Sequence, residues 1–220
     1  LWRLLTASGR RINPWSRRNL QQRASALATR GLLEFAEGHW KQAVRLLKRS
    51  APHSELPLIN YLAAARAANE LEDYAESDAL LREAYEVTPE ADVAIAVTQA
   101  QLQMVRGQFE QALATLTRLR KDHPKHLYAL KLMSQVYLRL EDWARLLELL
   151  PELRRQNALR EDELQALERR VHAALLAQAG QRLAAADSDP ASLVIAAWER
   201  MPTRLREDPE LIEAYALQLR

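Results

Sequence analysis

The sequence predicts an all-α protein built from tandem helix-turn-helix pairs, and three observations predict it. Four aromatic residues, Trp40, Tyr74, Phe109 and Trp143, recur at an almost constant interval of about 34 positions. A leucine follows each of them at a fixed offset. The 220 residues include only 5 glycines and 9 prolines and show no strand pattern. Because this interval is the period of tetratricopeptide repeats, we expect a tetratricopeptide-like solenoid of antiparallel helix pairs, wound as a right-handed superhelix.

Each aromatic is expected to begin the second helix of a pair. Turn-forming residues precede it, as in Gly38-His39 and Glu72-Asp73. Positions three and seven residues after the aromatic share its helix face, so a small residue there permits close packing and a leucine fills the next turn. The first of these positions holds Ala43, Ser77, Ala112 and, as the exception, Leu146, and the second holds Leu47, Leu81, Leu116 and Leu150.

The first helix of each pair is marked by a small residue nine positions before the aromatic. These residues are Gly31, Ala65, Ala100 and Ser134. The pairs are therefore expected at about 24–51, 58–88, 93–122 and 127–156. Pro151 predicts a kink or a shortening of the last helix among them. We expect all four aromatics to be largely buried between the two helices of their pair, so that replacing Phe109 by alanine costs about 3–5 kcal/mol.

The aromatic marker is lost after Arg160, although helical signals continue. The acidic run Glu161–Glu163 favours a helix start, and an apolar stripe follows it as far as Gly180, where we expect the helix to stop. Asp189-Pro190 and Asp208-Pro209 predict the starts of two further helices. Residues 157–220 are therefore expected to continue the stack as degenerate helical repeats, truncated at the C-terminus of what we interpret as a fragment of a longer protein.

The first residues of the chain are strongly basic. Residues 1–33 contain seven arginines and no acid, whereas the remaining residues carry 24 basic and 29 acidic side chains. Arginines beside Trp2 and an apolar start are typical of a segment that lies next to a membrane on its cytoplasmic side. Residues 1–23 are thus interpreted as a membrane-proximal leader, with these arginines at the membrane surface: Arg3, Arg10, Arg11, Arg17 and Arg18.

Two other interpretations of this leader stay open. A solvated lead-in to the first repeat explains the same composition. Nucleic-acid binding uses arginines and aromatics as well, but the remaining residues have a formal charge of −5 and show no basic stripe, so no nucleic-acid partner is expected. No run of about 20 apolar residues is present to span a bilayer.

No constellation for catalysis or cofactor binding stands out in the sequence. The chain lacks cysteine, and its 5 isolated glycines form no G-x-G phosphate-binding turn. The histidines show no H-x-x-x-H pair, so each is interpreted as a solvated turn residue and no metal site is expected. They are His39, His53, His123, His126 and His172. We therefore predict that the protein is not an enzyme.

Several segments together resemble the bacterial HemY family over about residues 20–220. The Asn60–Ala64 block is the most specific of them. The segments are Glu34–Trp40, Pro57–Ala65, His123-Pro124, Trp143–Pro151, Trp198 with Met201-Pro202, and Asp208–Leu211. The resemblance implies an inner-membrane tetratricopeptide protein that is associated with haem biosynthesis, with an N-terminal anchor and with its repeats facing the cytoplasm.

Three functional hypotheses follow from the repeats and the resemblance. The first is a membrane-tethered scaffold that binds proteins, namely enzymes of tetrapyrrole biosynthesis, through its groove. The second is a carrier or accessory factor that binds porphyrin or haem directly, and the third is a general assembly adaptor outside haem metabolism. No cofactor is required by the first or the third hypothesis.

The groove of such a solenoid is lined by the first helix of each pair. Amides there can bond a peptide backbone, and cations can pair with its carboxylates. Arg66, Lys131 and Arg139 are the preferred candidates because three cations on one wall favour an anionic partner. Offsets from the aromatics assign the whole partner groove to Arg66, Asn69, Gln101, Met104, Tyr128, Lys131, Gln135 and Arg139.

Overall fold

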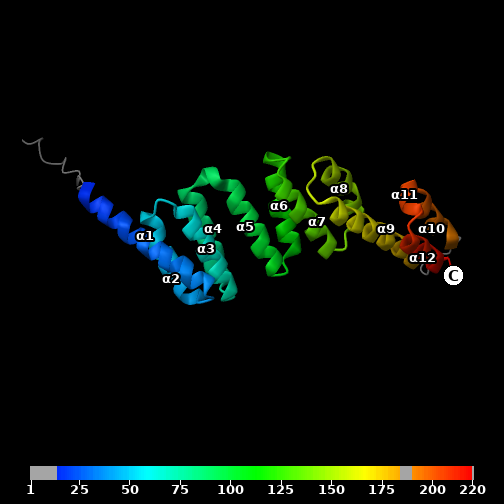
Figure 1. The fold of residues 1–220 in the computed structure, drawn as a ribbon. Helices are drawn as coiled ribbons and strands as arrows, with labels where there is room; N and C mark the ends of the chain where they lie inside the picture. Colours follow the sequence, from blue (N-terminus) through cyan, green and yellow to red (C-terminus); the bar gives the residue numbers. More distant parts are fainter. Residues whose placement is uncertain (1–13, 184–189, 220) are drawn as a thin grey trace, which may run out of the picture. The chain divides into compact units, whose positions relative to one another are not determined.

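A computed structural model describes residues 14–183 and 190–219 (Figure 1), which form α-helices, two short 3-10 turns and no strand. The all-α, helix-turn-helix class is therefore confirmed. The helices divide between two compact units, one ending at Leu102 and the other beginning at Gln103. The first elements are α1 (Pro14–Ala36), α2 (Trp40–Ser50), η1 (Ala51–His53), α3 (Pro57–Glu70), α4 (Tyr74–Val87), η2 (Pro89–Ala91) and α5 (Asp92–Val105). The others are α6 (Phe109–Asp122), α7 (Leu127–Arg139), α8 (Trp143–Arg155), α9 (Glu161–Leu183), α10 (Pro190–Glu199), α11 (Thr203–Arg206) and α12 (Pro209–Gln218).

The second helix of each of the four pairs begins at the predicted aromatic, as α2, α4, α6 and α8 show. Within the first unit, α1 packs on α2 and α3 packs on α4 (Figure 1). Within the second unit, α7 packs on both α6 and α8. The helix α1 begins at Pro14 and thus already includes part of the predicted leader. The division into leader, four repeats and a C-terminal part stays a prediction, as does the handedness of the superhelix.

A left-handed backbone turn connects the two helices of every pair. It lies two residues before the aromatic, with φ values of 80° at Gly38, 58° at Glu72, 74° at Gly107 and 54° at Glu141. The two pairs that lack glycine there have an aspartate at the next position. Asp73 Oδ1 accepts a hydrogen bond from the backbone N–H of Glu76, and Asp142 Oδ1 accepts one from that of Arg145, each at 3.1 Å. A capping aspartate therefore accompanies the strained turn where glycine is missing.

The small residues and leucines of the repeat pattern form the helix contacts, as predicted. All twelve are buried in the first or the second unit, including the exceptional Leu146. The helices α1 and α2 approach closely at Gly31, where an added Cβ would lie 2.8 Å from Leu47 Cγ. A larger side chain at this position would push α1 away from α2.

The expectation that all four aromatics are largely buried is wrong. Only Trp143 is buried, with 8% of its surface exposed, whereas Tyr74 is 40% exposed. Trp40 and Phe109 are half-buried. The first residue of a helix lies at the end of the helix contact, where the neighbouring helix covers only one side of the ring. Trp40 packs there against Phe35, with ring centroids 5.3 Å apart.

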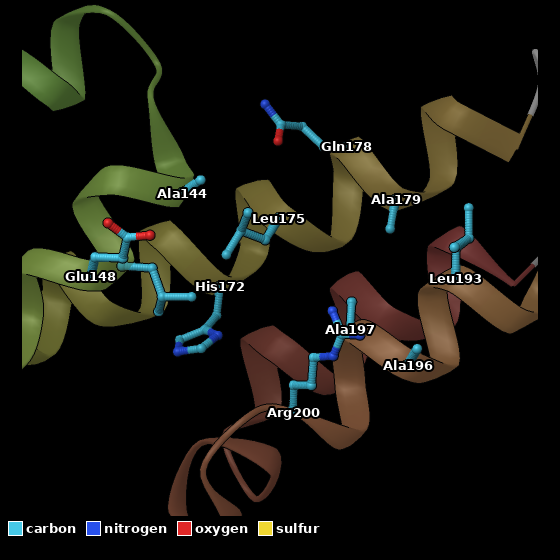
Figure 2. Close-up of a pocket in the computed structure, with 11 residues that line it drawn as sticks. Ala144, Glu148, His172, Leu175, Gln178, Ala179, Leu193, Ala196, Ala197 and Arg200 are labelled. Atoms are coloured by element: carbon cyan, nitrogen blue, oxygen red, sulfur yellow. The ribbon is translucent and has the colours of Figure 1, made fainter.

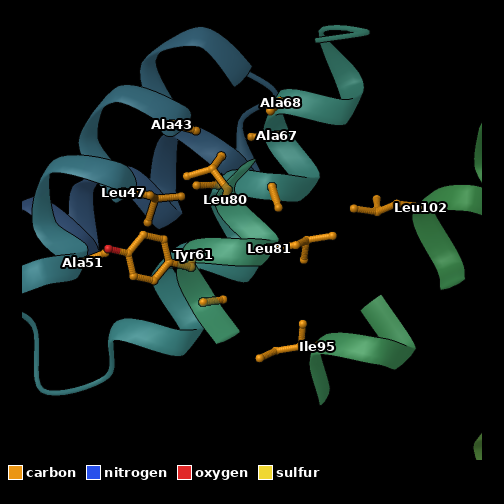
Figure 3. Packing of buried hydrophobic residues seen from close by; sticks show 13 residues of the cluster. Ala43, Leu47, Ala51, Tyr61, Ala67, Ala68, Leu80, Leu81, Ile95 and Leu102 are labelled. Carbon is orange, nitrogen blue, oxygen red and sulfur yellow. The ribbon is translucent and has the colours of Figure 1, made fainter. Parts of the chain in front are cut away.

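The core of the first unit joins α2, α3, α4 and α5 (Figure 3). The ring of Tyr61 lies in this core beside Leu47 and Ala51, and burial raises the pKa of its hydroxyl. The neighbouring Asn60 is also buried, and its Nδ2 donates a hydrogen bond to Ser50 Oγ at 3.2 Å. The block that carries the family resemblance most specifically therefore packs the first unit together.

The second unit departs from the regular repeat at α9. This helix has 23 residues, whereas α7 and α8 have 13 each. The predicted stop at Gly180 is wrong because α9 continues to Leu183. A Cβ on Gly180 would lie 2.0 Å from Gln218 Oε1 of α12, so the flexible end of that side chain would have to move. The helix α8 continues through Pro151 to Arg155, close to the predicted end of its pair, and the expected kink at Pro151 stays a prediction.

Candidate functional site

The first unit contributes α3 and α5 to the predicted groove. Arg66 lies on the exposed face of α3, and its Nη2 donates a hydrogen bond to Gln101 Oε1 of α5 at 2.8 Å. Met104 is half-buried one turn further along α5. Asn69 is buried, so its assignment to an open groove is wrong. It lies in the last turn of α3, on the side that faces the core of the unit.

The second unit contributes α7, whose two faces differ sharply. One face is buried by Leu130, Met133 and similar residues. The other presents the predicted groove residues Tyr128, Gln135 and Arg139 as exposed side chains. Lys131 lies on this face with its Nζ 3.7 Å from Glu163 Oε2 of α9, so a carboxylate of its own chain partly satisfies its charge.

The predicted membrane-surface arginines are only partly covered by the structure. Arg3, Arg10 and Arg11 lie outside the described residues, as does the side chain of Arg17. Arg18 lies exposed near the start of α1. None of the described helices is long and apolar enough to cross a bilayer.

A cavity that the repeat pattern does not predict lies between α8, α9 and α10 (Figure 2). Its volume is about 390 Å³, which is in the usual range for ligand pockets. Its walls are mainly apolar, and polar groups come from α8, from α9 and from Arg200 in the turn after α10. The lining residues are Ala144, Leu147, Glu148, His172, Leu175, Gln178, Ala179, Leu193, Ala196, Ala197 and Arg200.

The length of α9 explains the cavity. At about 1.5 Å per residue α9 is roughly 34 Å long, whereas α8 is roughly 20 Å long, so α8 covers only part of it. The 10-residue helix α10 packs farther along α9. The space between α8 and α10 is therefore open, and it is lined by the middle of α9. Loss of the aromatic marker after Arg160 was the only sequence signal of this change.

The prediction that each histidine lies in a solvated turn is wrong for His172. It lies in the middle of α9 with 8% of its surface exposed, and it lines the cavity. Burial lowers its pKa, the guanidinium of Arg204 lowers it further, and the carboxylate of Glu168 opposes the shift. The imidazole is therefore neutral at pH 7. Of the other histidines, His126 caps α7 by accepting a hydrogen bond from the backbone N–H of Ala129 at 3.1 Å.

An ion triad is centred on the buried carboxylate of Glu168, which lies on α9 one turn before His172. The carboxylate of Glu168 is 3% exposed, with one oxygen 2.6 Å from Arg154 Nη2 and the other 2.6 Å from Arg204 Nη2. Because the arginines belong to α8 and α11, this carboxylate connects three helices of the second unit. It stabilises the arrangement of α8 on α9 that bounds the cavity.

One cluster among the described residues has the composition of a metal site. The ligand atoms of Glu34, Glu37 and His39 lie within 4.8 Å of one another. His39 Nδ1 is 3.0 Å from Glu34 Oε2 and 3.4 Å from Glu37 Oε2. His39 and Glu37 are both largely exposed in the turn after α1. The cluster is accounted for by ion pairing across the turn.

Comparison with known proteins finds two family profiles that each match part of the chain. A family profile described as "HemY protein N-terminus" matches residues 1–72, and one described as "Tetratricopeptide repeat" matches residues 68–136. Proteins called "Protein HemY" from Escherichia coli K12 and from Shigella flexneri are each 29% identical over 179 residues. The aligned region is 81% of this chain and 45% of each relative, so the chain spans about half the length of these proteins.

The comparison with solved structures returns "Crystal Structure of the Yeast Tom70". The two chains are 14% identical with a TM-score of 0.49, over 96% of this chain and 44% of the other.

Proposed function

We propose that the chain, which is similar to HemY proteins and to tetratricopeptide repeats, is a membrane-tethered adaptor for proteins of haem biosynthesis. Its partners in this proposal are enzymes of tetrapyrrole biosynthesis. The repeats bind them from the cytoplasmic side of the inner membrane, and the basic leader lies against the membrane surface. The similarity to HemY proteins supports the pathway, and the repeats support protein binding as the activity.

The observation that carries the proposal is the two-faced helix α7. Its apolar side is buried, whereas Tyr128, Gln135 and Arg139 are exposed on the other side. No ion pair joins Arg139 to another described residue, so its charge is available to a carboxylate of a partner. An exposed row of an aromatic, an amide and a cation suits recognition of an acidic peptide segment.

Binding to purified tetrapyrrole-biosynthesis enzymes of the same organism tests this proposal. Each enzyme is immobilised, and binding of the wild-type chain is compared with that of Arg139→Glu and Gln135→Ala. The matched control is Arg145→Glu, which changes an exposed arginine on the second helix of the same pair. We expect micromolar binding to at least one enzyme, weakened about tenfold or more by Arg139→Glu and unchanged by the control. Absence of binding to every enzyme would count against the proposed function.

The membrane part of the proposal has a separate test. Sedimentation with vesicles of mixed zwitterionic and anionic lipid is compared for the chain and for a variant with Arg3, Arg10, Arg11, Arg17 and Arg18 replaced by glutamine. Since each arginine contributes up to about 1 kcal/mol near an anionic surface, binding is expected to fall by more than tenfold. Equal sedimentation of both proteins would contradict a role of the leader at the membrane.

Direct binding of porphyrin or haem is the second candidate function, and the cavity of the second unit favours it. His172 would hold the iron, the apolar walls would contact the macrocycle, and Arg200 would pair with a propionate. Haem bound in this way would supply an iron centre that His172 ligates. A visible-absorption titration tests the idea, with a Soret shift expected for the wild type and lost in His172→Ala.

A further inference from the structure

We infer that the cavity between α8, α9 and α10 is a docking site for an amphipathic helix of a partner protein. The partner helix inserts apolar side chains into the cavity and carries a base on one side of them and an acid on the other. This inference rests on the proposed adaptor function and deepens it, because it names a second contact surface outside the predicted groove and the kind of partner that fits there.

The first step of the argument is the apolar mouth of the cavity. Leu147 of α8 is 36% exposed and Leu193 of α10 is 44% exposed, although both line the cavity. Leu175 lies between them on α9, and several alanines complete the walls. A volume of about 390 Å³ is large enough for two aliphatic side chains or for one aromatic side chain. Exposed apolar surface at a preformed hollow is typical of an interaction site.

The second step is the charge at the rim. Glu148 projects from α8 and Arg200 from the turn directly after α10, so the two walls carry opposite charges (Figure 2). In the part of the chain that the structure describes, no ion pair joins either side chain to another residue. A uniformly charged surface, such as an anionic membrane, would be attracted by Arg200 and repelled by Glu148. A ligand with both signs of charge flanking an apolar centre complements this rim.

The third step identifies the ligand as a helix. A helix presents apolar residues at positions i and i+4 on one face, with charged residues one turn before and one turn after them. One helical turn is about 5.4 Å long, so such a ligand can place its charges near two walls while its apolar residues enter the space between them. The cavity is itself bounded by three helices, and the open side permits a fourth to pack on them.

The test uses three fluorescent, alanine-rich peptides, each about five helical turns long so that it forms a helix, with two central leucines at i and i+4. The first carries lysine before and glutamate after the leucines, the second carries two glutamates, and the third two lysines. A helix can dock in either direction, so only the sign pattern of the charges matters. By fluorescence anisotropy the mixed-charge peptide is expected to bind the wild-type chain about two- to fivefold more tightly than the others.

Rim and cavity variants make the prediction specific. Glu148→Lys is expected to shift the preference to the two-glutamate peptide, and Arg200→Glu to the two-lysine peptide. Ala144→Trp, at an exposed position of α8, fills the mouth and is expected to weaken all three peptides by about tenfold or more. The matched control is Ala75→Trp, at an exposed position of α4 that does not line the cavity. Thermal melting followed by circular dichroism checks that each variant is folded.

The outcomes separate this inference from the proposed function. Equal binding of the three peptides, or unchanged binding to Ala144→Trp, overturns the inference. If an enzyme of the pathway binds Ala144→Trp as well as it binds the wild type, the inference fails and the proposed function stands. If the peptide preferences appear but no enzyme binds, the docking site stands and the proposed pathway fails. A Soret shift that His172→Ala abolishes and that the peptides cannot suppress assigns the cavity to porphyrin and overturns the inference.

Discussion

Arg66 and Gln101 occupy the same position in the first helices of two consecutive repeat pairs, and Nη2 of Arg66 donates a hydrogen bond to Oε1 of Gln101 at 2.8 Å. The contact joins α3 to α5 across one repeat. Both side chains belong to the predicted groove, so the groove residues of the first unit bind each other when no partner is present. A partner that binds there must replace this hydrogen bond with its own.

Replacing Arg66 by alanine should weaken partner binding while changing the stability of the chain only slightly. The hydrogen bond is exposed, so we expect the free energy of unfolding to fall by less than about 1 kcal/mol. Affinity for a partner enzyme should fall by about fivefold or more, because a guanidinium that can pair with a carboxylate is lost. Chemical denaturation and binding to the immobilised enzyme measure the two effects. Arg82→Ala, at an exposed position of the second helix α4, is the control and should change neither.

Core leucines should matter more for stability than the aromatics that mark the repeat. Leu116 is fully buried on α6, so Leu116→Ala is expected to cost about 2–5 kcal/mol. Tyr74 is 40% exposed at the start of α4, so Tyr74→Ala should cost about 1 kcal/mol or less. Phe109 is half-buried, so the cost of Phe109→Ala in unfolding free energy should lie between these two values. Urea denaturation of the three variants gives the order, and a larger loss for Tyr74→Ala than for Leu116→Ala would contradict it.

The left-handed turn offers a test of backbone strain without a change in packing. Gly107 has a φ of 74°, and an added Cβ there would meet no atom within 4 Å. Gly107→Ala should therefore cost about 1 kcal/mol through conformational strain alone. Glu141 has a φ of 54° at the equivalent position, so Glu141→Gly should be neutral or stabilising by up to about 1 kcal/mol. Denaturation midpoints that shift in the opposite directions would refute this explanation.

The repeat period predicted most of this fold because it depends on local geometry. The start of each second helix, the small contact positions and the buried leucines follow from one helix face and its spacing, as Ala43 and Leu47 illustrate. Burial of the aromatics did not follow, since burial at the first residue of a helix depends on how far the neighbouring helix extends. Tyr74 and Trp143 share a position in the repeat but differ fivefold in exposure.

The cavity could not be predicted from the period, because it arises where the period ends. Gly180 indicated a helix stop by its residue type, but α9 continues past it and the side chain of Gln218 from α12 lies over it. His172 lies within the apolar stripe of α9, but its residue type was interpreted as that of a solvated turn. Its surroundings come from α9 and from its packing with α8 and α10, which are tertiary contacts that residue spacing does not reveal.

The buried carboxylate of Glu168 should be the most sensitive charged group of the second unit. Glu168→Gln removes a charge that faces two arginines at 2.6 Å and leaves both guanidinium groups without their anion. The carboxylate is buried, but the side chains of Arg154 and Arg204 are 40% and 48% exposed and can be hydrated, so the expected cost is about 1–3 kcal/mol. Glu163→Gln is the matched control, because Glu163 is partly exposed and 3.7 Å from Lys131, and it should cost less than about 1 kcal/mol. Similar denaturation curves for the two variants would show that the triad contributes little.

Burial of His172 makes stability depend on pH in a predictable direction. Its pKa in the folded chain lies below the ordinary value of about 6.5, chiefly because of burial and further because of Arg204, while Glu168 opposes the shift. Between the folded and the unfolded pKa the unfolded state binds more protons, so the free energy of unfolding falls as the pH drops through about 6.5. The decrease levels off once the pH lies below the folded pKa as well.

A variant with no titrating group at this position should lose that pH dependence. Denaturation of the wild type and of His172→Gln is compared between pH 8 and pH 5, and the stability of the wild type relative to the variant should decline toward pH 5. His53→Gln, which changes an exposed histidine in η1, should retain the wild-type slope. A wild-type stability that rises on acidification relative to His172→Gln would mean that the carboxylate of Glu168 outweighs burial. The imidazole would then be charged in the cavity at pH 6, and the cavity would favour anionic ligands below that pH.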